Sequence, residues 1–379
     1  MSSGHVVVAA DKFKGSLTAV QVAERVAAGF RAVRPELPVV TVPVADGGDG
    51  TVDAAVAAGF TRMETMATGP LGDPVRAAYG LRDGVAIVEL AEASGLRRLP
   101  GGRLAALTAT SRGTGDMIAA ALAQGARRVV IGLGGSACTD GGAGMVRALG
   151  VRLLDARGHD LPPGGAALAG LHALDLTKFT RPEGVTFTLA SDVDNPLLGP
   201  HGAAAVYGPQ KGARPQDVAR LEEGLARFAG IVERDLGVRV RDAHGAGAAG
   251  GTGFAAMAFL GATPASGIDL LLDLLGFAAR LPGAALVVTG EGALDEQTLH
   301  GKAPAGVAAA ASARGVPVIA VCGRTTLTAG QLHGAGIRRA FALTDIEKDE
   351  DRLMTEAGPL MERLAADIAT RWPALFDGE

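Results

Sequence analysis

Carboxylates, lysines and hydroxyls gather in short glycine-rich segments, each directly after an apolar run. The densest of these segments spans residues 289–304 and contains Glu291, Asp295, Gln297, Thr298 and Lys302. Carboxylates can bind Mg²⁺ or accept a proton from a hydroxyl, and lysines can neutralise phosphate, so this combination fits phosphoryl transfer. Acids that only cap a helix would not account for the Gly-Lys-x-Pro sequence that follows them.

A second polar cluster, at residues 11–16, lies between an apolar run and a helix-like stretch. It contains Asp11, Lys12, Lys14 and Ser16. The N-terminus of a helix favours anions, so the two lysines there predict an anion site. The alternative is a solvated turn in which Ser16 or Thr18 caps the helix.

A third cluster, at residues 46–51, combines two acids with three glycines. Asp46 ends an apolar run, and Gly47 and Gly48 would let a ligand approach the backbone closely. The D-x-D-x-D spacing of a calcium loop is missing. The alternative is a tight turn with an Asp cap.

Residues 132–144 match the pattern G-x-G-x-x-A after an apolar run, with Gly134, Gly135 and Ser136 in the loop and Asp155 about 20 residues on. This is the best support for a different class of protein, an NAD-dependent 2-hydroxy acid dehydrogenase. Thr139 and Asp140 are not part of a dinucleotide fingerprint, and they add a hydroxyl and a carboxylate suited to phosphate and metal.

Two further polar turns lie in the middle of the chain. Residues 191–196 place Asp192 and Asp194 two positions apart before an Asn-Pro pair, a rigid acidic turn that could hold Mg²⁺ or accept a proton. Residues 208–212 add Lys211 in a turn. For the acidic turn, an Asx-turn without a ligand is an equally good interpretation.

The elements that must position these residues alternate between short apolar runs and helical patterns. The runs occupy residues 6–10, 39–44, 129–131, 186–190, 286–288, 318–321 and 340–343. This alternation predicts a parallel sheet with crossover helices, in which the loops after the strands share one edge and bind ligands there. Residues 65–102 are interpreted as turns and short strands.

We therefore predict an α/β protein with two domains. Residues 1–60 and 275–379 would form a doubly wound, flavodoxin/Rossmann-like parallel sheet, and residues 61–274 would form an inserted second α/β domain. A length of 379 residues suits two domains, and 48% hydrophobic residues can fill their cores.

Charge and cysteine content exclude several classes of function. The net charge is −4 with both signs interspersed, so neither a nucleic-acid-binding face nor a membrane-binding segment is expected. No stretch of about 18 apolar residues occurs, which argues against a membrane span. Cys138 and Cys322 lack metal-ligand spacing, so two buried thiols in a reducing, cytoplasmic protein are expected.

Taken together, the clusters resemble the bacterial glycerate kinase family of the non-P-loop type. The motifs that carry the resemblance lie, in the family's order, at residues 11–17, 43–51, 134–137, 192–197, 208–212, 245–251 and 290–302. The resemblance implies an enzyme that uses ATP and Mg²⁺ to phosphorylate glycerate. It also implies a flavodoxin-like domain and a restriction-endonuclease-like α/β domain, with substrate in the cleft between them. Asp49 stands where Glu is common, and Ala293 stands where a longer side chain is usual.

For this reaction, we expect each polar residue to have one of three roles: proton transfer, phosphate or substrate binding, or metal binding. Asp192 or Asp295 would deprotonate the acceptor hydroxyl, and Lys14 would assist catalysis. Lys12 and Lys302 would face phosphates or the glycerate carboxylate. Asp194 and Glu291, together with Asp46, would hold Mg²⁺. The other expected substrate- or phosphate-binding residues are Ser16, Asp46, Gly47, Gly48, Gly134, Gly135, Ser136, Lys211, Gln297 and Thr298.

Several questions stay open at this stage. A dehydrogenase, or a non-catalytic protein that binds sugar acids, remains as an alternative. The sequence does not distinguish phosphorylation of the 2-hydroxyl from that of the 3-hydroxyl. It also leaves the assembly open, with a homodimer among the options.

Overall fold

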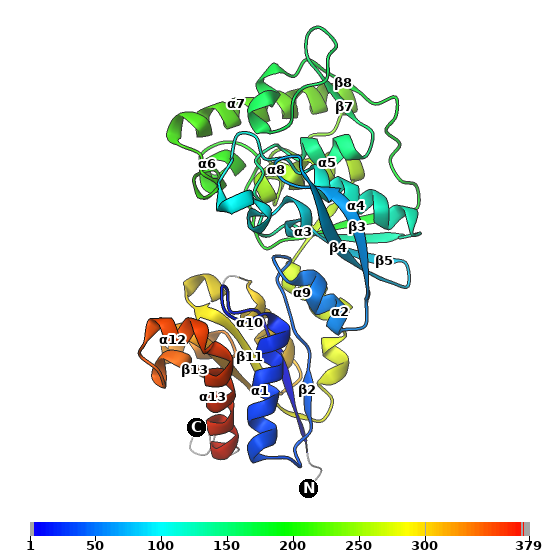
Figure 1. The fold of residues 1–379 in the computed structure, drawn as a ribbon. Coiled ribbons are helices and arrows are strands. Elements are labelled where there is room, and N and C mark those ends of the chain that lie inside the picture. The colour runs from blue at the N-terminus through cyan, green and yellow to red at the C-terminus, as the bar shows by residue number, and fades with distance from the viewer. Residues whose placement is uncertain (1–3, 300, 373, 375–379) are drawn as a thin grey trace. The chain divides into compact units, whose positions relative to one another are not determined.

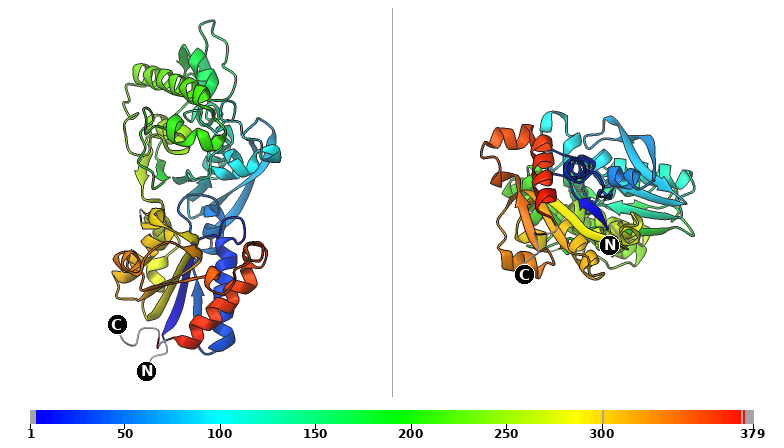
Figure 2. Two further views of the ribbon diagram at one scale, coloured as in Figure 1. Left: turned by 90° about the vertical axis from the view of Figure 1, so that its left-hand side faces the viewer. Right: turned by 90° about the horizontal axis from the view of Figure 1, so that it is seen from below.

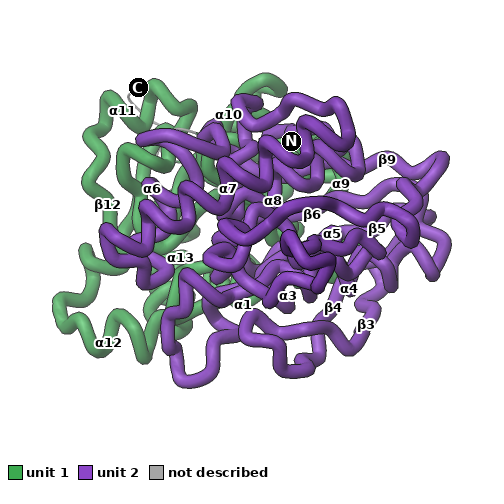
Figure 3. Tube along the Cα trace, turned by 90° about the horizontal axis from the view of Figure 1, so that it is seen from above, with its two compact units in different colours: residues 1–46, 53–59, 268–379 green, residues 47–52, 60–267 purple. Residues whose placement is uncertain are grey.

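The chain folds into two compact units (Figure 3). The computed structural model describes residues 4–299, 301–372 and 374. Unit 1 comprises residues 1–46, 53–59 and 268–379, and unit 2 comprises residues 47–52 and 60–267. The domain limits 1–60, 61–274 and 275–379 remain a prediction, and each unit is described by itself below.

Unit 1 is built on a five-stranded sheet in the order β13-β12-β11-β1-β2 (Figure 1). Its strands are β1 (His5–Ala10), β2 (Val39–Thr41), β11 (Ala284–Leu294), β12 (Val318–Thr325) and β13 (Arg339–Ala342). All four strand pairs are parallel. Counted along the chain within the unit, the order is the 2-1-3-4-5 order of flavodoxin-like sheets. The predicted parallel α/β fold is confirmed.

Helices pack on the sheet of unit 1 because its central strands are apolar on both faces. Residues 6–10 of β1 are fully buried. The core on one face combines Val6 and Val8 with residues of α1 (Ala19–Val33) and α13 (Ala357–Arg371). These helices approach closely at Gly29, where an added Cβ would lie 2.3 Å from the carbonyl oxygen of Glu362.

The remaining helices of unit 1 are short. Helix α10 (Ala303–Ser312) contacts β1, β11 and β12 and buries Val307, Ala308 and Ala311. Helix α1 begins with a capping box, in which Thr18 Oγ1 accepts from Gln21 N and Gln21 Oε1 accepts from Thr18 N. The others are α2 (Thr51–Ala57), which starts in unit 2, α9 (Gly267–Leu274), α11 (Ala329–Gly334) and α12 (Glu350–Thr355).

Unit 2 contains a six-stranded mixed sheet in the order β10-β9-β6-β5-β4-β3. The strands are β3 (Thr61–Thr68), β4 (Pro74–Arg82), β5 (Val85–Glu89), β6 (Arg128–Gly132), β9 (Thr186–Ala190) and β10 (Thr263–Ala265). Strands β5, β6, β9 and β10 are parallel, whereas β3 and β4 are antiparallel. The turns and strands expected at residues 65–102 are present, but β3 and β4 are longer than predicted, with 8 and 9 residues. Polar residues along the edge strand β3 hide its strand pattern.

Six α-helices, a π-helical turn and a small hairpin accompany this sheet among the described residues of unit 2 (Figure 2). The α-helices are α3 (Ala91–Ser94), α4 (Arg112–Ala123), α5 (Ala143–Ala148), α6 (Ala203–Tyr207), α7 (Pro215–Leu236) and α8 (Ala248–Ala255), followed by a π-helical turn at Ala256–Leu260. The hairpin consists of β7 (Arg152–Leu154) and β8 (Ala173–Asp175). Phe228 of α7 packs between Phe254 and Phe259 in the core.

Two expectations from composition concern single features. Cys138 and Cys322 are both buried free thiols, as predicted. Across the described residues, no helix has the length and apolar character that crossing a membrane would require.

Candidate active site

The polar cluster of unit 1 lies where the strand order of its sheet reverses, between β1 and β11. The Asp11 amide donates to the carbonyl oxygen of Gly290 at 2.8 Å, which fixes the first residue after β1 beside β11. In parallel α/β sheets the helices on either side of this reversal diverge, and ligands bind at the carboxyl ends of the strands there.

Asp11 is a buried acid that faces other charges. Its side chain is within 3.5 Å of Lys12 Nζ, and its Oδ1 accepts from the Lys12 amide at 2.6 Å. Burial, together with the neighbouring charges of Asp46 and Glu291, raises the pKa of Asp11 to about 7, while Lys12 opposes the shift. A carboxyl group whose pKa lies near neutral pH can bind a cation or exchange a proton.

Glu291 and Lys302 form the other half of this cluster. Glu291 Oε1 accepts from Thr298 Oγ1 at 2.5 Å, and burial raises the pKa of the Glu291 carboxyl. Lys302 Nζ lies 3.7 Å from Glu291 Oε2 and 3.6 Å from Asp295 Oδ1. Lys302 is also the residue directly before α10, so its charge sits at the positive end of that helix. The arrangement puts a partly exposed cation and helix amides next to buried acids.

The donor set fits a magnesium ion that arrives with a phosphate. Within the described part of the chain, no group of three or more His, Cys, Asp or Glu side chains is arranged to hold a metal ion. Mg²⁺ is usually held by one or two carboxylates together with waters and substrate phosphates, so a complete protein cage is not required. Asp11, Asp46 and Glu291 repel one another, and a divalent cation would relieve that repulsion.

Three other predicted residues of unit 1 lie around this cluster. Lys14 is exposed, and Gln297 is exposed in the short 3₁₀ turn Glu296–Leu299. The Ser16 hydroxyl donates to the Phe13 carbonyl oxygen at 3.2 Å and so stabilises the turn. Thr18, not Ser16, caps α1.

The predicted glycine cluster at residues 46–51 is divided between the units. Asp46 belongs to unit 1, whereas Gly47 and the residues up to Val52 belong to unit 2. An added Cβ on Gly47 would lie 2.4 Å from the Ala190 carbonyl oxygen, and one on Gly134 would lie 2.3 Å from Gly48 Cα. Only glycine allows these segments to meet at the carboxyl ends of β6 and β9.

Ser136 and Lys211 contact each other inside unit 2. Lys211 is 1% exposed, and its Nζ donates to Ser136 Oγ at 2.8 Å and to the Cys138 carbonyl oxygen at 2.5 Å. Burial lowers the pKa of Lys211. Gly135 has a φ of +72°, and an added Cβ there would lie 3.0 Å from Asp49 Oδ2. Lys211 therefore anchors the loop that follows β6.

Both carboxylate oxygens of Asp140 accept hydrogen bonds from the protein. Its carboxylate accepts from the amides of Ser111, Gly142 and Gly144 at 2.9, 3.1 and 3.1 Å. The hydroxyls of Thr110 and Ser111 donate to it as well. This buried acid ties α4 to α5, so the suggestion from sequence that it suits metal or phosphate is replaced by a structural role.

Asp192 and Asp194 lie in the loop after β9 and have different surroundings. Asp192 Oδ1 accepts from the Gly267 amide at 2.9 Å. The Asp194 side chain is 86% exposed and lies 3.5 Å from His244 Nδ1. Asp155, the acid of the dinucleotide alternative, sits in the hairpin turn after β7, where its Oδ1 accepts from the amides of Arg157 and His159.

A buried acidic cluster at the end of β5 was missed by the sequence analysis. Glu89 is 1% exposed, its Oε2 accepts from the Val52 amide at 3.1 Å, and its Oε1 lies 3.0 Å from Arg97 Nη2. Burial raises the pKa of Glu89 to about 7, while Arg97 opposes the shift. Arg97 also pairs with Glu92, and its Nε lies 3.5 Å from Asp49 Oδ1. The sequence feature that could have indicated this cluster is an acid directly after the apolar run 85–88.

Comparisons with known proteins identify the family. The model of the glycerate kinase family matches residues 6–373. The chain belongs to the glycerate kinase family. The resemblance inferred from seven motifs is thereby confirmed, and the family match and the position of Asp155 speak against the dehydrogenase alternative.

Individual relatives of this family match nearly the whole chain. A glycerate kinase of Bacillus subtilis is 45% identical over 368 residues, which is 96% of both chains. A glycerate 2-kinase of Escherichia coli is 44% identical and covers 89% of this chain and 90% of its own. The crystal structure of a putative glycerate kinase 2 from Salmonella typhimurium LT2 superposes with a TM-score of 0.85 at 42% identity, covering 98% of this chain and 99% of that one.

Proposed function

We propose that the chain is an ATP-dependent glycerate kinase of the cytoplasm that transfers the γ-phosphoryl group of Mg²⁺-ATP to a hydroxyl of D-glycerate. The observation that carries this proposal is the cluster of Asp11, Glu291 and Lys302 at the strand reversal of unit 1, in a chain of the glycerate kinase family. Buried acids beside partly exposed lysines are what a site for a magnesium-bound polyphosphate requires.

The lysines of unit 1 bind the anionic groups in this proposal. Lys12 and Lys302 have side chains that are 25% and 29% exposed, so a phosphate can replace their present carboxylate neighbours. Lys14 is exposed, and it is proposed to assist catalysis. The amides at the start of α10 add donors for phosphate oxygens. The turn after β1 contains Ser16, and the 3₁₀ turn after β11 contains Gln297 and Thr298.

The acids divide between metal binding and proton transfer. Glu291 and Asp46, with Asp11, would hold Mg²⁺, and Asp194 remains a second proposed ligand. When bound, Mg²⁺ neutralises charge on the phosphate oxygens. Asp295 or Asp192 would accept the proton of the glycerate hydroxyl. Asp295 Oδ1 is already oriented by the Gln297 amide at 3.0 Å, and Asp192 by Gly267.

The proposed substrate-binding residues of unit 2 include Gly47, Gly48, Gly134 and Gly135. Their lack of side chains lets residues 47–48 pack against Ala190 at the end of β9 and against Gly134 in the loop after β6. Ser136 is 7% exposed and is oriented by Lys211, so its role would be to present a hydroxyl to substrate.

The test is a coupled measurement of ADP release from purified protein, D-glycerate and Mg²⁺-ATP, with ³¹P NMR of the product. Stoichiometric phosphoglycerate supports the proposal, and the phosphorus–proton couplings assign the 2- or the 3-position. The name of the Escherichia coli relative favours 2-phosphoglycerate. ADP release no faster than without glycerate would reject the proposed substrate. Light scattering after gel filtration tests whether the protein is a homodimer.

A further inference from the structure

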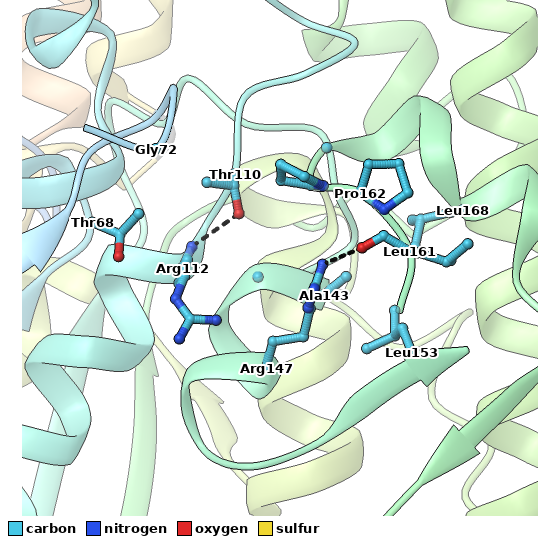
Figure 4. A pocket seen from close by; sticks show the side chains of 13 residues that line it. Thr68, Gly72, Thr110, Arg112, Ala143, Arg147, Leu153, Leu161, Pro162 and Leu168 are labelled. Carbon is cyan, nitrogen blue, oxygen red and sulfur yellow. Dashed lines mark hydrogen bonds between the residues drawn. The ribbon is translucent and has the colours of Figure 1, made fainter. Parts of the chain in front are cut away.

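A pocket in unit 2 is separate from the residues assigned to the kinase site above. It has a volume of about 180 Å³ and lies among α4, α5, the end of β3 and the loop before Gly164 (Figure 4). Ligand pockets for drug-sized molecules are roughly 300–1,000 Å³, so this one suits a smaller molecule than a nucleotide.

Two arginines give one side of the pocket its charge. Arg112 is the first residue of α4, and Arg147 lies in α5. In the described part of the chain, no carboxylate lies within ion-pair distance of either guanidinium. Arg147 Nη1 donates to the carbonyl oxygen of Leu161 at 2.9 Å, and among the described residues its other N–H groups have no protein acceptor.

The two positive charges act on each other. Burial lowers the pKa of Arg147, and the charge of Arg112 lowers it further, while Asp160 and Asp140 attract the guanidinium from beyond ion-pair distance. Two cations at a pocket wall without a paired carboxylate are stabilised by an anion between them.

The other side of the pocket is apolar. Leu153, Leu161, Pro162 and Leu168 lie opposite Thr68 and Arg112 in Figure 4. The hydroxyls of Thr68 and Thr110 already donate to Asp116 and Asp140. The free donors of the pocket are therefore those of the arginines, and a fitting ligand has one anionic end and one apolar end.

We propose that this pocket binds a short organic anion, with its carboxylate or phosphate between Arg112 and Arg147 and its apolar end against Leu161 and Leu168. Occupation would be felt beyond the pocket, because Thr110 and Gly144 line it and both donate to Asp140. Asp140 holds α4 and α5 together, so a bound anion stabilises both helix starts.

The experiment titrates the purified full-length protein with isovalerate, isobutyl phosphate and the neutral isovaleramide by isothermal calorimetry. We expect saturable binding of one or both anions and none of the amide. The stronger anion identifies the preferred head group. Hydrogen exchange should slow at residues 110–114 and 142–147 when the anion is added.

Variants locate the binding. Arg112→Gln and Arg147→Gln should each weaken the affinity about tenfold or more, because each removes charge-assisted hydrogen bonds. Arg103→Gln, at an exposed position outside the pocket, is the matched control and should leave the affinity unchanged. Lys302→Met should also leave it unchanged, which separates this pocket from the proposed phosphate site in unit 1.

Three results would overturn the proposal. They are no saturable binding of either anion, equal binding of isovaleramide, and unchanged affinity in both arginine variants. Arg112→Lys and Arg147→Lys, which keep the charge, serve if a glutamine variant fails to fold, and they should retain part of the affinity. None of these outcomes depends on glycerate turnover.

Discussion

Each unit contains a lysine beside a glycine turn, but the two lysines have different surroundings. In unit 1, Lys302 is 29% exposed, and its nearest carboxylate oxygens lie at 3.6 and 3.7 Å. In unit 2, Lys211 is 1% exposed and donates at 2.8 and 2.5 Å. Both lysines follow glycine-rich turns in the sequence, yet only the first has capacity left for a ligand.

The difference teaches how to separate residues that can bind a ligand from residues that hold a site together. Long contacts between partly exposed charges contribute little to stability and are easily exchanged for a phosphate. Short hydrogen bonds from a buried cation satisfy groups that would otherwise be buried without partners, and they resist exchange. The comparison therefore makes opposite predictions for the two lysines.

The largest effect is expected for Lys302→Met. Removing a preorganised cation from a phosphoryl-transfer site should lower kcat/KM for D-glycerate by about 10²–10³-fold. The free energy of unfolding should change by less than about 1 kcal/mol, since the lost ion pairs are long and partly exposed. Steady-state kinetics and urea unfolding measure the two quantities. Lys348→Met, at an exposed position of unit 1, is the control, and equal losses in both variants would break the comparison.

Lys211→Met should have its main effect on stability. The substitution leaves the Cys138 carbonyl oxygen and the Ser136 hydroxyl without their donor, which should cost about 2–4 kcal/mol in the free energy of unfolding. Urea titration of the variant and of Lys178→Met, an exposed lysine of unit 2, provides the measurement. A Lys211→Met protein as stable as the control would mean that Lys211 is not an anchor.

The buried acid Glu89 should make the stability of unit 2 depend on pH. Its pKa is about 7 in the folded protein against 4.5 as the ordinary value. The folded state thus holds a proton that the unfolded state has lost, so this contribution to stability is complete below about pH 4.5 and disappears as the pH rises through 7. Glu89→Gln should remove at most about 3 kcal/mol of this decline, since one pKa unit is worth about 1.4 kcal/mol. Urea unfolding of both proteins at pH 5.5 and 8 measures the difference in slope, and parallel slopes would contradict the assignment.

The smallest effects are expected at glycines. Gly134→Ala should destabilise the protein by roughly 1–3 kcal/mol, because its Cβ would lie 2.3 Å from Gly48 Cα. Gly230→Ala, in α7 with no atom within 4 Å of the new Cβ, should instead stabilise by roughly 0.5–1 kcal/mol. Thermal unfolding of both variants decides between these signs. A stabilised Gly134→Ala would show that the two loops are not in close contact.

The sequence predicted the central strands of unit 1 well. Residues 6–10 are apolar on both faces, as a central parallel strand must be, so Asp11 at their end marked the carboxyl edge of the sheet, where ligands of such folds bind. The parallel α/β fold followed from the same alternation of runs and helices. Side-chain roles at the site stay predictions, since local sequence does not give the position of Asp192 or Asp194 relative to a ligand.

The sequence was least informative where distant segments meet. Nothing near Lys211 indicates that its side chain contacts Ser136 and Cys138, and its charge in a turn suggested a substrate or phosphate ligand instead. Asp140 looked like a metal ligand because its five donors come from the distant residues Thr110 and Ser111 and from the later glycines 142 and 144. Glu89 was overlooked because a helix, and no glycine, follows it.

The division of unit 1 between the two ends of the chain has a consequence for synthesis on the ribosome. Strand β1 pairs with β11, which begins only at Ala284, whereas the strands of unit 2 all lie between Thr61 and Ala265. At roughly 5–20 residues per second, the first strand waits on the order of tens of seconds for its partner. Unit 2 can thus be complete while residues 5–41, the β1-α1-β2 segment, still lack the rest of their sheet and remain exposed to chaperones and proteases.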